Sequence, residues 1–120
     1  TTGDIPVSSP ELTALDLVSY ANRIGGLNRI ATVLAELSES MDAGQLAREA
    51  ADYGCDTVAQ RLGYLLGNVL GEADLTAGLL TWVQGRQPRY AAVAPGSETK
   101  GRPRERHWRV IVNETVESEV

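Results

Sequence analysis

Residues 56–71 read DTVAQRLGYLLGNVLG, and this stretch carries two periodic patterns on one predicted helix. Apolar side chains at helical spacing form the stripe that a core would bury, at Val58, Leu62, Leu65, Leu66 and Val69. Small residues recur at every fourth position, at Ala59, Gly63, Gly67 and Gly71. Because a glycine inside a helix costs about 1 kcal/mol relative to alanine, this small-residue ridge indicates that another backbone approaches the helix closely.

Two interpretations of the small-residue ridge are open. Gly63 and Gly67 receive either a neighbouring helix of the same chain, which we favour because several helices are predicted, or a partner protein. Arg61 and Tyr64 lie three residues apart near the rim of the apolar stripe. They are either a partner-binding pair or a rim tyrosine beside a solvated arginine. The candidate partner or packing face is therefore Gly63, Tyr64 and Gly67.

Four further helices are predicted around this one. Residues 8–26 predict the first: either Ser9 caps it with Pro10 at the first helical position, or Ser8 forms a capping box with Glu11. The glycine pair at positions 25 and 26 is expected to end it.

The other three helices are predicted over residues 27–37, 42–54 and 72–83, each from apolar side chains at helical spacing. Asp42 is a typical capping residue and Gly54 a typical left-handed stop. Since the loops between the helices are short, we expect neighbouring helices to run roughly antiparallel.

The pattern changes after residue 85. Residues 89–94 and 107–113 predict two strands, and a turn-rich, charged connection of about a dozen residues lies between them. We expect these strands to pair and to pack on the helices, because an isolated hairpin is only marginally stable. The predicted fold is therefore α+β, a single domain over residues 1–120, with about five helices in a compact bundle followed by a small antiparallel sheet or hairpin.

Charge is distributed unevenly along the 120 residues, whose formal net charge is −5. Residues 1–85 hold four basic against eleven acidic side chains, whereas residues 86–112, the basic segment, hold seven basic against two acidic ones. An acidic chain is not a general electrostatic clamp on nucleic acid, but such asymmetry is typical of a binding surface. The seven basic side chains are Arg86, Arg89, Lys100, Arg102, Arg104, Arg106 and Arg109. They either contact phosphates or an acidic partner, or form a solvated loop that balances the acidic helices.

Several function classes lack their residues in this sequence. One cysteine and one histidine exclude a disulfide framework and a multi-thiolate zinc site. The nucleophile-elbow, zincin and dinucleotide-binding motifs are absent from the sequence, and so is an apolar run long enough for a membrane span. We interpret Asp16 as a paired structural anchor, and Cys55 as a buried or half-buried thiol rather than a nucleophile with His107 as its partner. We therefore expect no enzyme, no catalytic residue, no metal site and no cofactor.

Three stretches carry a resemblance to a known family. They are VSSPELTALDL at residues 7–17, RLGYLL at residues 61–66 and WRVIVN at residues 108–113. In order and separation along nearly the whole chain they resemble the C-terminal domain of AbiEi-type antitoxins, the regulator half of AbiE abortive-infection toxin–antitoxin systems.

This resemblance implies a cytoplasmic, non-enzymatic antitoxin and transcriptional-regulator domain of a type IV toxin–antitoxin system. It implies a functional link to an AbiEii-like nucleotidyltransferase toxin, and operator DNA contact through a full-length protein. The family's N-terminal winged helix-turn-helix is expected to be absent from these 120 residues. The alternatives are a protein-interaction module of another bacterial regulator, which would use the small-residue ridge, and an enzyme fragment whose catalytic residues lie elsewhere.

Overall fold

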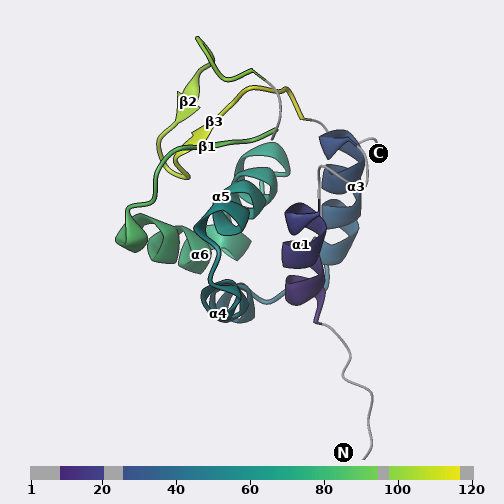
Figure 1. Cartoon of the computed structure of the whole chain (residues 1–120). Coiled ribbons are helices and arrows are strands. Elements are labelled where there is room, and N and C mark those ends of the chain that lie inside the picture. The colour runs from purple at the N-terminus through teal and green to yellow at the C-terminus, as the bar shows by residue number, and fades with distance from the viewer. Residues whose placement is uncertain (1–8, 21–25, 95–97, 117–120) are drawn as a thin grey trace, which may run out of the picture.

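The structure is a computed structural model that describes residues 9–20, 26–94 and 98–116. Its helices are, in chain order, α1 (Pro10–Ser19), α3 (Leu27–Ser38), α4 (Ala43–Tyr53), α5 (Asp56–Tyr64), the π-helical segment η1 (Leu65–Val69) and α6 (Ala73–Arg86). Three short strands follow within the described residues: β1 (Ala91–Ala92), β2 (Arg104–Glu105) and β3 (Val110–Ile111) (Figure 1). The predicted α+β class is confirmed, because the helices are followed by a small sheet. Since α5 and η1 form one continuous helix, the described residues contain the five expected helices.

Local capping explains where the first helices begin and end. The Ser9 hydroxyl accepts a hydrogen bond from the Leu12 amide at 3.1 Å, with Pro10 at the first helical position. Glu11 is buried, and its carboxylate accepts a hydrogen bond at 2.7 Å from the amide of Asp42, which lies between α3 and α4. The Ser9 alternative is therefore confirmed. The alternative cap at position 8 and the predicted stop at position 25 lie outside the described residues.

The caps of α4 also follow the sequence. Asp42 accepts a hydrogen bond from the Gln45 amide at 2.9 Å, and Gly54 ends the helix in the left-handed conformation with φ 71°. Gly71 has φ 74° and lies between η1 and α6, where the predicted end of the ridge-bearing helix falls. No helix among the described residues has the length and apolar composition needed to cross a membrane.

The sheet differs from the expected hairpin. Its strand order is β1-β3-β2, and β1 pairs with β3 in parallel, whereas β2 pairs with β3 antiparallel. Pairing between residues 89–94 and 107–113 is therefore present, but the prediction of an antiparallel arrangement for it is wrong. The hairpin is formed instead by β2 and β3. The reason is that the chain reverses a second time inside the predicted connection, where β2 occupies two charged positions without apolar alternation.

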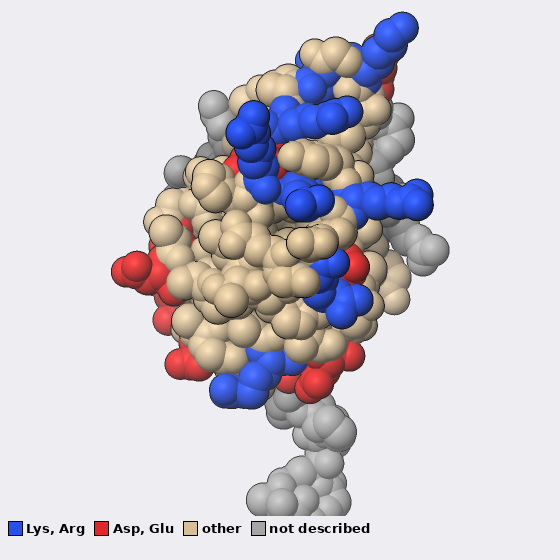
Figure 2. Space-filling view, turned by 90° about the vertical axis from the view of Figure 1, so that its left-hand side faces the viewer, with Lys and Arg blue, Asp and Glu red and all other residues tan. Residues whose placement is uncertain are grey.

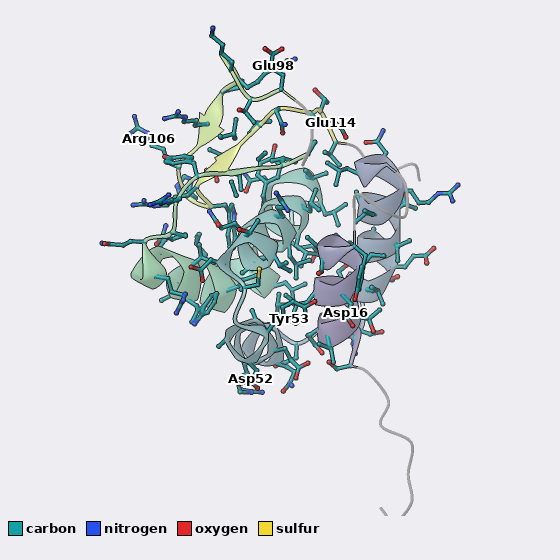
Figure 3. All side chains as sticks on the ribbon, in the orientation of Figure 1. Asp16, Asp52, Tyr53, Glu98, Arg106 and Glu114 are labelled. Atoms are coloured by element: carbon teal, nitrogen blue, oxygen red, sulfur yellow. The ribbon has the colours of Figure 1, made fainter. Side chains whose placement is uncertain are left out.

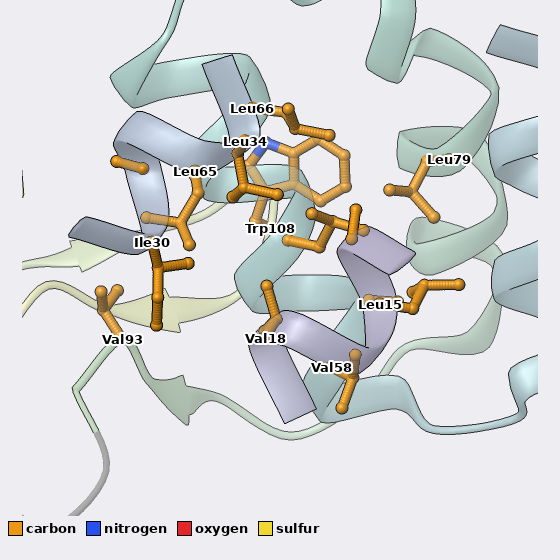
Figure 4. Close-up of a cluster of buried hydrophobic side chains, with 14 of the residues drawn as sticks. Leu15, Val18, Ile30, Leu34, Val58, Leu65, Leu66, Leu79, Val93 and Trp108 are labelled. Carbon is orange, nitrogen blue, oxygen red and sulfur yellow. The ribbon is translucent and has the colours of Figure 1, made fainter. Parts of the chain in front are cut away.

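One hydrophobic core joins the helices to the sheet. Leu15 of α1, Leu34 of α3 and Leu79 of α6 belong to one buried cluster with Leu65 and Leu66 of η1, which are fully buried (Figure 4). The largest contribution from the sheet is Trp108, which precedes β3, is 2% exposed and lies in the same cluster. The sheet therefore packs on α5 and η1 through its inner face.

Candidate functional site

The seven predicted basic side chains gather on the sheet and its connections. Figure 2 shows Lys and Arg concentrated over the upper part of one face, above the acidic side chains of the helical body. All seven are exposed except Arg109, which is half-buried. Arg106 points away from the molecule at the sheet end, whereas Asp16 and Asp52 lie at the opposite end (Figure 3). We refer to the seven side chains together as the basic surface.

Strand register determines which side chains share the outer face of the sheet. Val110 is buried, so its inward direction sets the alternation along β3, and Ile111 points to the other side. Ala92 and Arg104 are the register partners of Ile111, so they share its outward face. Tyr90 has the same parity as Ala92 and therefore also faces outward. Consistent with this, the Arg104 guanidinium lies over the Tyr90 ring at 5.2 Å from its centroid.

Not all of the basic side chains are free to meet a ligand. Arg86 forms an ion pair with Asp56 and also lies over the Trp82 ring at 5.0 Å. Arg109 donates to the Pro88 carbonyl at 3.2 Å. The remaining guanidinium and ammonium groups have no ion-pair partner in the described part of the chain: those of Arg89, Lys100, Arg102, Arg104 and Arg106.

Glu105 is an acidic side chain inside the basic segment, and its carboxylate has a structural role. It accepts hydrogen bonds from the His107 amide at 2.9 Å and the Trp108 amide at 2.8 Å, and lies 2.7 Å from the His107 ring nitrogen Nδ1. These contacts close the turn between β2 and β3. Glu105 thus fixes the backbone that carries Arg106 and orients Trp108 toward the core.

Two polar side chains of α5 hold the sheet in place, and sequence patterns did not identify them as such. Gln60 is 1% exposed, and its amide nitrogen donates to the carbonyls of Arg89, Trp108 and Arg109 at 2.9, 3.1 and 2.8 Å. Arg61 donates to the Ala92 carbonyl at 2.7 Å, and burial lowers the pKa of its guanidinium. In the sequence, the position of Gln60 next to Ala59 of the small-residue ridge was the one feature that could have indicated this role.

A third anchor joins the chain beyond β1 to the chain beyond β3. The Asn113 side chain accepts from the Ala94 amide and donates to the Ala94 carbonyl, both at 2.9 Å, and is buried. It thereby reproduces the hydrogen bonding of a neighbouring strand where strand pairing has stopped. The three anchors make the outer face of the sheet a rigid platform on the helical body.

The small-residue ridge is occupied from within the chain. A Cβ atom at Gly63 would lie 2.1 Å from an atom of the Trp108 indole, and one at Gly67 would lie 3.6 Å from the indole nitrogen. Tyr64 is half-buried, and its pKa is raised by burial and, to a smaller extent, by the charge of Glu105. These contacts place Gly63 and Gly67 of the small-residue ridge against the Trp108 indole, which lies between β2 and β3.

The remaining chemical candidates do not converge. Asp16 accepts a hydrogen bond from the Tyr53 hydroxyl at 3.0 Å, so it is paired (Figure 3). Cys55 is half-buried at the N-terminus of α5, while His107 contacts Glu105 in the exposed turn. Over the described ranges, no group of three or more His, Cys, Asp or Glu side chains is arranged to hold a metal ion.

Comparison with known proteins gives one finding. The family model of the AbiEi antitoxin C-terminal domain matches residues 1–68, from the start of the chain into η1. The match includes the first two stretches that suggested the resemblance, and the third, residues 108–113, lies beyond it together with the basic surface. No curated protein and no solved structure matches the chain significantly.

Proposed function

The chain belongs to the AbiEi antitoxin C-terminal domain family, and from this membership we propose that it is a non-enzymatic, cytoplasmic antitoxin domain. It counters a nucleotidyltransferase-like toxin of the AbiEii kind and supports repression at an operator. The observation that carries the antitoxin role is the family match across the helices from α1 to η1.

The basic surface supports a second element of the proposal, contact with a nucleic acid. Arg89, Lys100, Arg102 and Arg106 are exposed and have no ion-pair partner within the described residues. If the basic segment only balanced the charge of the acidic helices, its side chains would be expected to form ion pairs with carboxylates of those helices. None of these four side chains does so within the described residues. Arginine and lysine side chains that are not engaged in ion pairs are able to contact the phosphates of a nucleic acid.

The alternative, a partner protein seated on the small-residue ridge, is less well supported. Trp108 fills the space over Gly63 and is itself 2% exposed. A partner helix would have to displace this indole from the hydrophobic core, at the cost of burying it again elsewhere. The packing of Trp108 thus favours a structural role for Gly63 and Gly67.

A growth assay tests the antitoxin role. The 120-residue chain is co-expressed with an AbiEii-like nucleotidyltransferase toxin, and we expect it to restore growth. Arg102→Glu/Arg106→Glu, which reverses two free charges, is expected to weaken repression from an operator reporter or to reduce rescue. Arg29→Glu/Arg48→Glu on α3 and α4 makes the same charge change on the helical body and is the matched control.

The outcomes separate the two elements. Absence of rescue by the folded wild-type chain would contradict the antitoxin role. Equal effects of the two charge-reversed variants would contradict a specific role for the basic surface. An effect confined to Gly63→Leu, in a variant whose circular dichroism spectrum is native, would favour the partner-protein alternative.

A further inference from the structure

Tyr90 is an exposed aromatic side chain within the basic surface. It is 36% exposed, and it stands on the outer face of the sheet one residue before β1. Tyr20 on the helical body is the other large hydrophobic side chain that is comparably exposed among the described residues. The Arg104 guanidinium, which has no ion-pair partner among the described residues, lies over the Tyr90 ring. The ring is therefore partly exposed, with a cation over it that a ligand could engage.

The backbone on both sides of Tyr90 is held by hydrogen bonds. The preceding peptide group is fixed because the Arg89 carbonyl accepts from Gln60 at 2.9 Å. The following peptide group is fixed because the Ala91 amide donates to the Arg109 carbonyl at 3.0 Å. A ligand that stacks on Tyr90 therefore meets a ring whose attachment is already ordered, which lowers the entropic cost of binding.

Trp82 of α6 differs from Tyr90 in how its arginine is held. It is also an aromatic ring with an arginine over it, but that arginine, Arg86, is tied to Asp56 by an ion pair. Arg104 has no such acidic partner among the described residues. Arg104 can therefore contact a phosphate either while it lies over the Tyr90 ring or after it has moved away from the ring. Of these two arginine–aromatic pairs of the described residues, the Tyr90 pair is the one whose arginine is not held by a carboxylate.

We propose that the outer face of the sheet binds single-stranded nucleic acid, with one unpaired base stacked on Tyr90 and the flanking phosphates on Arg104 and the neighbouring free cations. This inference rests on the proposed nucleic-acid contact and names its form. Every base has a π-face, so stacking on tyrosine tolerates any sequence. In a duplex the same faces are covered by neighbouring base pairs, and exposing one requires that the base be flipped out of the stack.

Fluorescence anisotropy with labelled 20-nucleotide probes tests the proposal: single-stranded DNA, single-stranded RNA of the same sequence, and the DNA duplex. We expect the single strands to bind more tightly than the duplex, and the comparison of DNA with RNA identifies which of the two single strands is preferred. Tyr90→Ala is expected to weaken single-strand binding about ten-fold, as loss of one base–aromatic stack does. Tyr90→Phe, which keeps the ring, should bind within about two-fold of wild type on the same grounds.

Tyr20→Ala is the matched control, since it removes an exposed tyrosine outside the basic surface, and its affinity should be unchanged. Equal single-strand affinity of wild type and Tyr90→Ala would overturn the stacking proposal. If Arg102→Glu/Arg106→Glu still abolished binding in that case, the proposed nucleic-acid contact would stand without it. Tighter binding of the duplex than of either strand would also overturn the proposal. Failure of all three probes to bind would overturn both the stacking and the nucleic-acid contact.

Discussion

Gly63 is the residue on which the joint between helix and hairpin depends most directly. An added Cβ would lie within 2.4 Å of three atoms of the Trp108 ring system, which is fixed in the core and has no flexible end to move aside. Overpacking of this kind costs about 1–3 kcal/mol or more, which exceeds the gain of about 1 kcal/mol in helix propensity. We expect Gly63→Ala to lower the free energy of unfolding by about 2 kcal/mol in urea denaturation.

Gly85 in α6 offers the matched control for this prediction. It is also a helical glycine, but a Cβ there would meet no atom within 4 Å. Gly85→Ala should therefore raise the free energy of unfolding by about 0.5–1 kcal/mol through helix propensity alone. Stabilisation of both variants would show that Trp108 does not occupy the small-residue ridge.

Replacement of Gln60 should destabilise the attachment of the sheet to α5, because its side chain donates to backbone carbonyls beside both β1 and β3. In Gln60→Leu, three carbonyls lose their shared donor in a buried place, and such loss costs about 1–3 kcal/mol. We expect a fall of about 2 kcal/mol in the free energy of unfolding, and faster hydrogen exchange at the Ala91 amide. Gln84→Leu on the exposed side of α6 should change stability by less than about 0.5 kcal/mol. Unchanged exchange at Ala91 in Gln60→Leu would refute this anchoring role.

At the scale of elements, helix limits were predictable and strand pairing was not. Ser9, Asp42 and Gly54 act on residues within one turn of themselves, so a single sequence contains the whole interaction. The strands are only two residues long, and their partners are chosen by contacts with distant residues such as Gln60 and Asn113. Alternation of apolar residues therefore located β1 and β3 but gave neither their relative direction nor the existence of β2.

The β2–β3 hairpin depends on its turn, and Glu105 is the side chain that closes it. Glu105→Gln leaves one acceptor oxygen for two backbone amides, those of His107 and Trp108, so one amide loses its partner. A hydrogen bond to a charged group contributes about 1.5–3 kcal/mol, and we expect a loss of about 1.5 kcal/mol by urea denaturation. Glu98→Gln removes the same charge from an exposed position in the basic segment and should be nearly neutral. Equal stability of the two variants would exclude a role for the carboxylate in the turn.

At the scale of the whole molecule, the sequence predicted the basic residues of the candidate site but not the aromatic side chain among them. The run of basic residues after residue 85 indicated a surface, because seven basic side chains against two acidic ones in one segment are typical of a binding surface. The exposed Tyr90 and its contact with Arg104 required the register of three strands, which joins residues 14 positions apart. The same structure shows which of the seven cations are already engaged, a distinction that composition does not contain.

The separation of charge gives a final prediction for the molecule as a whole. The chain has a net charge of −5, so nucleic acid should bind only at the basic surface. Because few basic side chains are then in contact with phosphates, binding should release few counterions. If the five side chains without an ion-pair partner, those of Arg89, Lys100, Arg102, Arg104 and Arg106, each neutralise one phosphate, the logarithm of the single-strand association constant should fall with the logarithm of salt concentration with a slope of about −3.5. Arg102→Gln/Arg106→Gln should make this slope shallower by about 1.4, because each neutralised phosphate contributes about 0.7 to it. Arg29→Gln/Arg48→Gln should leave it unchanged, because those two charges lie on the helical body. A slope that both pairs of substitutions alter equally would mean that the long-range field of the whole chain, and not contact at the basic surface, governs binding.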